Sequence, residues 1–321
     1  MKNIKKNARK KCRNGCGNGN NFIDQHFKGA TMKYLFSAMI ISGLFIAGCD
    51  KSTDPVTDNS ILYEDAAEAI SAAVGDESGG VTENFADVMI AGGSGSFVSA
   101  MPVTDGADLV TAGIPLYDSL TGFWSVSVNR SFETILAQRS ITREYRYQFQ
   151  KNGTMQKNFV TGTDTATTLK FKIVSGTGYF RGPRVMHKLI RMSGAWTSNN
   201  INKDTVTITL DSTYVRSGVD TITTRSMVRT HTGTMTLTDV NVKAPRFRPL
   251  LYTTWRGNFH RAISGTISGN YTALITFQRG DAYKERSINR DFTITVGEGA
   301  GSLTINGGGK FIVGILDGQR K

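Results

Sequence analysis

Cysteine is almost absent from this 321-residue chain, and the few that occur lie near its start. The three are Cys12, Cys16 and Cys49, so residues 50–321 contain none and cannot form a disulfide among themselves. Cys12 and Cys16 would need further ligands to hold zinc, and His26 is the one histidine close to them in the sequence. We therefore predict no metal site and no cofactor.

Basic residues are missing from residues 52–129, where twelve acids occur without a single Lys or Arg. Residues 130–321 show the reverse, with 28 basic and 12 acidic side chains. Residues 1–48 alone contribute +8 of the formal net charge of +12, so the total does not describe one basic surface, and a nucleic-acid partner is disfavoured. The asymmetry indicates either docking of the acidic segment onto the basic part or an anionic partner.

No strongly apolar run reaches the roughly 20 residues that a membrane-spanning helix needs. Residues 34–47 form a run of 14 after Met32 and Lys33, and a secretory signal has an apolar core of about 7–15 residues. We therefore predict an export signal at residues 32–48. Residues 1–31 lack apolar periodicity and are expected to be a disordered extension or a start assigned too early.

The apolar run ends in Ile46-Ala47-Gly48-Cys49. This ending, with the basic flank and the run length, resembles the lipobox of bacterial lipoproteins over residues 32–50. The resemblance implies that the thiol of Cys49 carries a diacylglyceryl group and that a peptidase cleaves between Gly48 and Cys49. It implies a location in the bacterial cell envelope, anchored in a membrane through the Cys49 lipid and facing the periplasm or the cell exterior. Which membrane is involved stays open.

The chain after the signal divides into three predicted parts. Residues 49–60 are polar, contain Pro55 and predict a tether. Residues 61–120 are acidic, and apolar residues at helical spacing predict two short helices there, at about 65–74 and 82–91. Residues 121–321 form the third part, a β domain.

Apolar and polar residues alternate with a period of two through residues 121–321. Such alternation is typical of half-buried antiparallel strands. Leu169-Phe171-Ile173, Val206-Ile208-Leu210 and Phe292-Ile294-Val296 are examples.

Turn residues separate these strands. Asn152-Gly153 predicts a tight hairpin, and Ser268-Gly269-Asn270 and residues 306–309 predict further turns. The predicted fold class is mainly β, an antiparallel meander forming a barrel-like or sandwich domain, with a short helical N-terminal segment.

Catalytic motifs give no positive signal. The chain contains no Gly-x-Ser-x-Gly pentad, and Gly309-Lys310 is followed by Phe311 and not by the Ser or Thr of a phosphate loop. No catalytic residue is therefore predicted, although a site assembled only by the fold from a His with Ser, Asp or a metal stays open.

The strongest binding signal lies in residues 243–261, where basic and aromatic residues alternate. No acid occurs between Asp239 and Asp281. One interpretation is a surface for anionic lipid headgroups or acidic polysaccharide. The alternatives are core aromatics beside solvated arginines, or a basic surface covered by the acidic segment. The candidate residues are Arg246, Arg248, Trp255, Arg256 and Arg261.

The sequence thus favours a lipid-anchored, non-enzymatic envelope lipoprotein with a binding or structural role and an unknown ligand. The alternative is a lipid-anchored hydrolase that acts on envelope polymers. The two differ in what the fold should bring together, because a hydrolase should place a His beside an Asp, Glu or Ser in a concave pocket.

Overall fold

The computed structural model describes residues 59–94, 108–133, 135, 137–182, 185–223 and 227–321. These residues all belong to one compact unit, Thr53–Lys321. The unit has its own core and its own hydrogen-bonded sheet, which makes it a self-contained folding unit. The predicted extension and signal, most of the predicted tether, and the residues Gly48 and Cys49 lie outside the described part.

The chain begins with two helices and continues as a long series of strands, interrupted once by a helical insertion. The helices are α1 (Asn59–Val74), α2 (Val81–Ser94), η1 (Pro249–Leu251) and α4 (Tyr252–Ala262). The strands are β1 (Asp108–Ala112), β2 (Leu116–Asp118), β3 (Phe123–Glu133), β4 (Gln138–Lys151), β5 (Thr154–Gln156), β6 (Val160–Thr161), β7 (Asp164–Thr165), β8 (Thr168–Arg181), β9 (Val185–Asn199), β10 (Thr205–Thr223), β11 (Val228–Pro245), β12 (Ser264–Arg279), β13 (Ala282–Gly297), β14 (Ala300–Ile305) and β15 (Gly309–Gly314).

Thirteen strands form one antiparallel sheet in the order β1-β3-β4-β8-β9-β10-β11-β12-β13-β14-β15, with β2 beside β3 and β5 beside β4. β6 and β7 pair only with each other. Nearly every strand therefore lies beside its neighbour in the chain, and the predicted mainly β class with an antiparallel meander is confirmed. In the described residues no ladder joins β1 to β15, so the sheet stays open.

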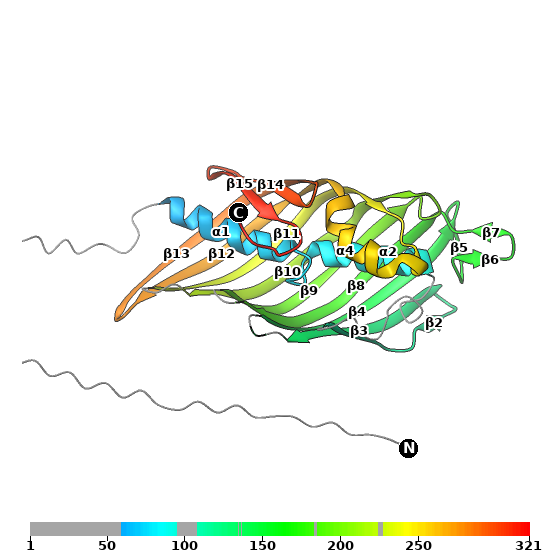
Figure 1. Ribbon diagram of the computed structural model, residues 1–321, viewed down its shortest axis with the longest axis horizontal. Coiled ribbons are helices and arrows are strands. Elements are labelled where there is room, and N and C mark those ends of the chain that lie inside the picture. The colour runs from blue at the N-terminus through cyan, green and yellow to red at the C-terminus, as the bar shows by residue number, and fades with distance from the viewer. Residues whose placement is uncertain (1–58, 95–107, 134, 136, 183–184, 224–226) are drawn as a thin grey trace, which may run out of the picture. The chain divides into compact units, whose positions relative to one another are not determined.

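The long strands bend around the helical segment, which lies across one face of the sheet (Figure 1). β10 has 19 residues, and its register with β9 and β11 shifts between Thr209 and Val215. Such irregularities bend a strand and increase its twist. The face toward the helices is called the inner face below, and the opposite face the outer face.

The period-two pattern explains which residues reach the inner face. In β12, Tyr271, Ala273, Ile275 and Phe277 are buried, whereas Thr272 and Leu274 between them are exposed. The inner-face side chains form one hydrophobic core with the apolar residues of α1 and α2.

The two N-terminal helices fill the space above the inner face. α1 packs against β11, β14 and β15, and α2 packs against β8, β11 and α4. Every residue from 81 to 92 is buried, because the sheet and α4 cover α2 on different sides. A helix buried all round is expected to be apolar throughout, so any charge on α2 needs a specific partner.

Most local predictions agree with the structure. The two helices cover the stretches that periodicity predicted, although α1 begins at Asn59, inside the predicted tether, and not near residue 65. Asn152 and Gly153 both have positive φ, 51° and 81°, in the β4–β5 hairpin, as a tight turn of that sequence requires. Residues 306–308 connect β14 to β15.

Three features differ from expectation. The turn predicted at Ser268-Gly269-Asn270 is wrong, because these residues lie inside β12. The sheet begins with β1 and β2, which lie within the stretch 61–120 that was expected to be helix and loop. α4 was not predicted at all. Among the described residues, no helix combines the length and apolar character needed to cross a membrane.

Candidate functional site

Two acids of α2 form a buried ion cluster with arginines of the sheet. Glu83 lies 2.7 Å from Arg130 and 2.6 Å from Arg143, measured between carboxylate oxygen and guanidinium nitrogen, and 3.2 Å from Arg139. Asp87 pairs with Arg130 and, at 3.3 Å, with Arg143. Both acids are completely buried, and the three arginines are at most 6 % exposed. We call these five residues the ion cluster.

Electrostatics keep the cluster ionised. Burial alone would raise the pKa of Glu83, but the charges of Arg143, Arg139 and Arg130 outweigh it and hold that pKa well below its usual range. The hydroxyl of Tyr145 donates a hydrogen bond to Asp87, and burial raises the pKa of this tyrosine well above its usual value. A buried charge is costly without partners, so the cluster fixes the position of α2 on β3 and β4.

The turn between the two helices is tied to Arg143 of the ion cluster and to Arg216 of β10. The carbonyl of Gly79 accepts hydrogen bonds of 2.8 Å from both Arg143 and Arg216. Gly79 has φ of +72°, a conformation that residues with a Cβ rarely adopt. The glycine therefore lets one carbonyl face two guanidinium groups.

Further acids of residues 59–94 pair with β11, with α4 and with the end of the chain. Asp65 lies 3.2 Å from Arg229, Asp76 accepts a 2.8 Å hydrogen bond from Arg256, and Glu64 lies 3.2 Å from Arg320. The acidic segment thus docks on the basic part of the chain. Of the four arginines of the predicted basic surface, Arg256 takes part through its pair with Asp76.

Two histidines on the inner face each face an acid. Nδ1 of His187 lies 2.6 Å from Asp220, and Nε2 of His231 lies 3.6 Å from Asp65 of α1. The hydroxyl of Tyr271 is 3.4 Å from Nδ1 of His231. Burial opposes ionisation of Asp220, but His187, Arg216 and His231 together outweigh it and lower the pKa of that carboxyl.

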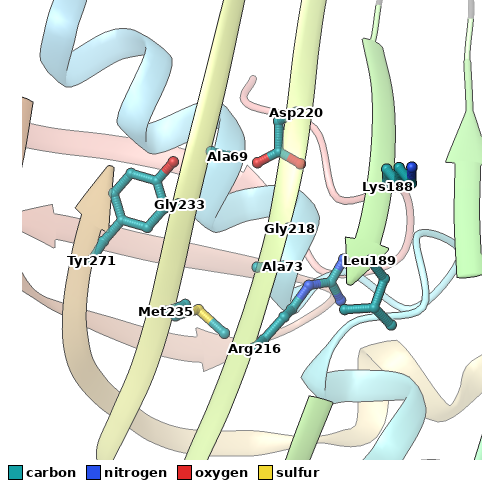
Figure 2. A pocket seen from close by; sticks show the side chains of 10 residues that line it. All are labelled: Ala69, Ala73, Lys188, Leu189, Arg216, Gly218, Asp220, Gly233, Met235 and Tyr271. Atoms are coloured by element: carbon teal, nitrogen blue, oxygen red, sulfur yellow. The ribbon is translucent and has the colours of Figure 1, made fainter. Parts of the chain in front are cut away.

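The cavity beside these groups is small. Ala69 and Ala73 of α1 close it above, and Figure 2 shows Arg216, Asp220 and Tyr271 around it on the sheet. The cavity has a volume of about 20 Å³. This is room for about one water molecule. A polymer chain does not fit here with α1 in place.

A larger recess lies on the outer face. It has a volume of about 380 Å³ and is lined by Gly113 and Ile114 of the β1–β2 connection, Leu116 of β2, Arg146 of β4 and Val174 of β8, among others. We call it the outer groove. Volumes of this size suit small ligands.

The outer groove combines aliphatic walls with a few polar groups. Ile114 is 84 % exposed, Leu116 70 % and Val174 42 %. Arg146 donates a 3.2 Å hydrogen bond to the hydroxyl of Ser125 at the floor. The histidines His187 and His231 lie elsewhere, on the inner face.

The predicted basic surface is only partly assembled. Trp255 is half-buried between Phe247 and Phe259, with ring centroids 4.9 Å away on both sides, and its aromatic neighbours belong to the core. Arg256 is committed to Asp76. Arg261 is exposed at the end of α4.

The two remaining arginines of that set lie before η1. Arg246 stacks over the ring of Phe159, 5.3 Å from its centroid, and donates to the carbonyl of Asn202. Arg248 forms an exposed ion pair with Asp204 at 2.8 Å. The five predicted residues therefore do not converge on one ligand.

Sequence reasoning missed the ion cluster and the His–Asp pairs, although a signal for them exists. Arg130 follows Val126 and Val128 in the inward phase of β3, and Arg139 and Arg143 alternate with Ile141 in the same way on β4. A charged residue at a strand position that the alternation assigns to the buried face indicates a buried partner of opposite charge. In the part of the chain that the structure describes, no three His, Cys, Asp or Glu side chains come together as metal ligands.

Comparisons with known proteins add no assignment. A scan against protein-family models gave no match, and searches of curated proteins and of solved structures gave none either.

Proposed function

We propose that this protein is a lipid-anchored, non-enzymatic lipoprotein of the bacterial envelope that binds a small amphiphilic ligand in the outer groove. The anchor is the lipid on Cys49, and the sequence resemblance at residues 32–50 supports it. The observation that carries the binding role is the groove itself, with its volume of about 380 Å³ and its aliphatic walls.

The chemistry of the lining indicates the class of ligand. The groove exposes aliphatic surface of Ile114, Leu116 and Val174. Covering this surface with the apolar part of a ligand removes it from water, which is favourable. Arg146 offers a guanidinium group to a carboxylate or phosphate. A molecule with an apolar body and one anionic group matches both features, whereas Glu144, also in the lining, disfavours ligands of higher negative charge.

A fluorescence titration tests the binding role. The chain from residue 50 onward, which includes the whole compact unit, is titrated with a fluorescent fatty acid. Replacing Ile114 by Asp should weaken binding at least about ten-fold, because it buries a charge against the aliphatic body of the ligand. Ile190→Asp makes the same change at an exposed outer-face position and should leave the affinity unchanged. Equal affinities for all three proteins would refute the groove as the binding site.

A hydrolase remains the second candidate, because the structure brings His187 to 2.6 Å from Asp220. A carboxylate in this position orients an imidazole for general-base catalysis. Turnover of isolated envelope polymers that disappears in His187→Ala, in a variant that still binds the fluorescent fatty acid, would favour the hydrolase over the binding protein.

A further inference from the structure

One end of the sheet carries a group of loops that touch one another. Because the meander is antiparallel, the connections β2–β3, β4–β5, β5–β8, β9–β10 and β11–η1 lie at the same end. We call this surface the loop end; it comprises residues 119–122, 152–167, 200–204 and 246–251.

Contacts join these loops into one surface. The indole nitrogen of Trp124 donates to the carbonyl of Lys157 at 2.7 Å, and the amide of Gln148 donates to the carbonyl of Thr121 at 2.7 Å. Arg246 lies over the ring of Phe159, and its amide donates to the carbonyl of Asp204 at 2.9 Å. The loops are therefore held by the sheet and by each other.

Large apolar side chains project from several of these loops. Leu120 is 92 % exposed and Leu250 99 %, while Met155, Val160 and Leu251 are each a little more than half exposed. Single exposed aliphatic residues are ordinary, but their gathering on neighbouring loops indicates a surface that another body covers.

Basic residues lie on the same surface as these side chains. The loop end holds four, Lys157, Lys203, Arg246 and Arg248, against the two acids Asp164 and Asp204. Lys157 also lies over the ring of Tyr117, 5.1 Å from its centroid. Surfaces that bind the interface of an anionic bilayer combine exposed aliphatic side chains, amphipathic aromatic rings and neighbouring basic residues. The loop end has all three.

We infer that the loop end docks on the surface of an anionic phospholipid bilayer. Leu120, Met155 and Leu250 enter the interface, and Lys157 and Arg248 contact lipid phosphates. This contact is separate from the lipid on Cys49.

A bilayer fits this surface better than a protein partner does. The apolar side chains stand on three segments of a surface that also carries four cations. The core of a protein interface, by contrast, is depleted of charged residues, lysine in particular. The net charge of the loop end complements phospholipid headgroups and would be screened by salt.

Vesicle sedimentation tests the inference with the chain from residue 50 onward, which lacks the lipid-bearing cysteine. Vesicles of phosphatidylglycerol and phosphatidylethanolamine are compared with vesicles of phosphatidylcholine. The double variant L120S/L250S should lower partitioning onto the anionic vesicles at least about ten-fold, because two leucines leave the interface. The matched variant I190S/L274S removes two exposed aliphatic residues of the outer face and should change it by less than about two-fold.

The result separates this inference from the groove. Failure of the wild-type body to sediment with anionic vesicles, or equal sedimentation of L120S/L250S, would overturn bilayer docking, and the first outcome would assign the loop end to a protein partner. The fluorescent fatty acid should still bind L120S/L250S, and Ile114→Asp should still bind vesicles. Each proposal can therefore fail without the other.

Discussion

Replacing Glu83 by Gln tests the ion cluster, because it removes one charge and keeps the size of the side chain. Glu83 lies within 3.2 Å of Arg130, Arg139 and Arg143 and is completely buried. The variant leaves three buried guanidinium groups with Asp87 as the one acid of the cluster. Breaking a buried ion pair by removal of one partner costs about 3–5 kcal/mol. The whole free energy of unfolding of an ordinary domain is about 5–15 kcal/mol, so the loss is a large share of it.

Urea denaturation followed by circular dichroism measures this loss. Asp204→Asn is the matched control, because it removes the acid from an exposed ion pair. The side chain of Asp204 is 86 % accessible and that of its partner Arg248 is 61 % accessible. Exposed pairs contribute about 0–1 kcal/mol, so the control should unfold almost like the wild type. A Glu83→Gln protein that is no less stable than the control would refute the view that the cluster fixes α2 on the sheet.

Three further results are expected. Gly79→Ala should lower the free energy of unfolding by about 1–2 kcal/mol, measured by urea titration, because φ is +72° there; no change would mean that this turn adapts. The pKa of Glu83 is lower in the folded than in the unfolded protein. Its contribution to the free energy of unfolding is therefore present above about pH 4.5 and is lost as the pH falls through the pKa of the folded protein. Thermal melts between pH 6 and pH 3 should therefore fall more steeply for the wild type than for Glu83→Gln, and parallel curves would contradict this. Expression from Met32 should give the same mature mass and location as the full chain, and loss of export would show that residues 1–31 matter.

The strands were predictable because one sheet face is buried along most of their length. Period-two alternation identified the inner-face residues Phe292, Ile294 and Val296 of β13, and Asn152-Gly153 identified a hairpin through its need for positive φ. The same reasoning failed at Gly269. This glycine lies inside β12, where an added Cβ would lie 2.3 Å from the carbonyl oxygen of Thr236, so it serves close strand approach and not a turn.

The buried polar groups were not predictable in the same way, because their partners come from distant parts of the chain. Glu83 and Arg143 are 60 residues apart, and the sequence indicated only that acidic and basic segments attract. The basic residues chosen from local composition were those beside aromatics, and of these Arg256 does pair with Asp76. The arginines of the ion cluster, by contrast, occupy positions of β3 and β4 that otherwise hold buried apolar residues. The outer groove depends on the position of the β1–β2 connection, which no local pattern revealed.

Metabolic labelling with an alkyne fatty acid tests the proposed lipid anchor most directly. If Cys49 carries the lipid, the wild-type protein should be labelled and should sediment with membranes, and Cys49→Ala should lose the label. A Cys12→Ala variant is the control, because that residue precedes the proposed cleavage site and should not affect labelling. Equal labelling of the wild type and of Cys49→Ala, or an unlabelled wild-type protein, would contradict the account.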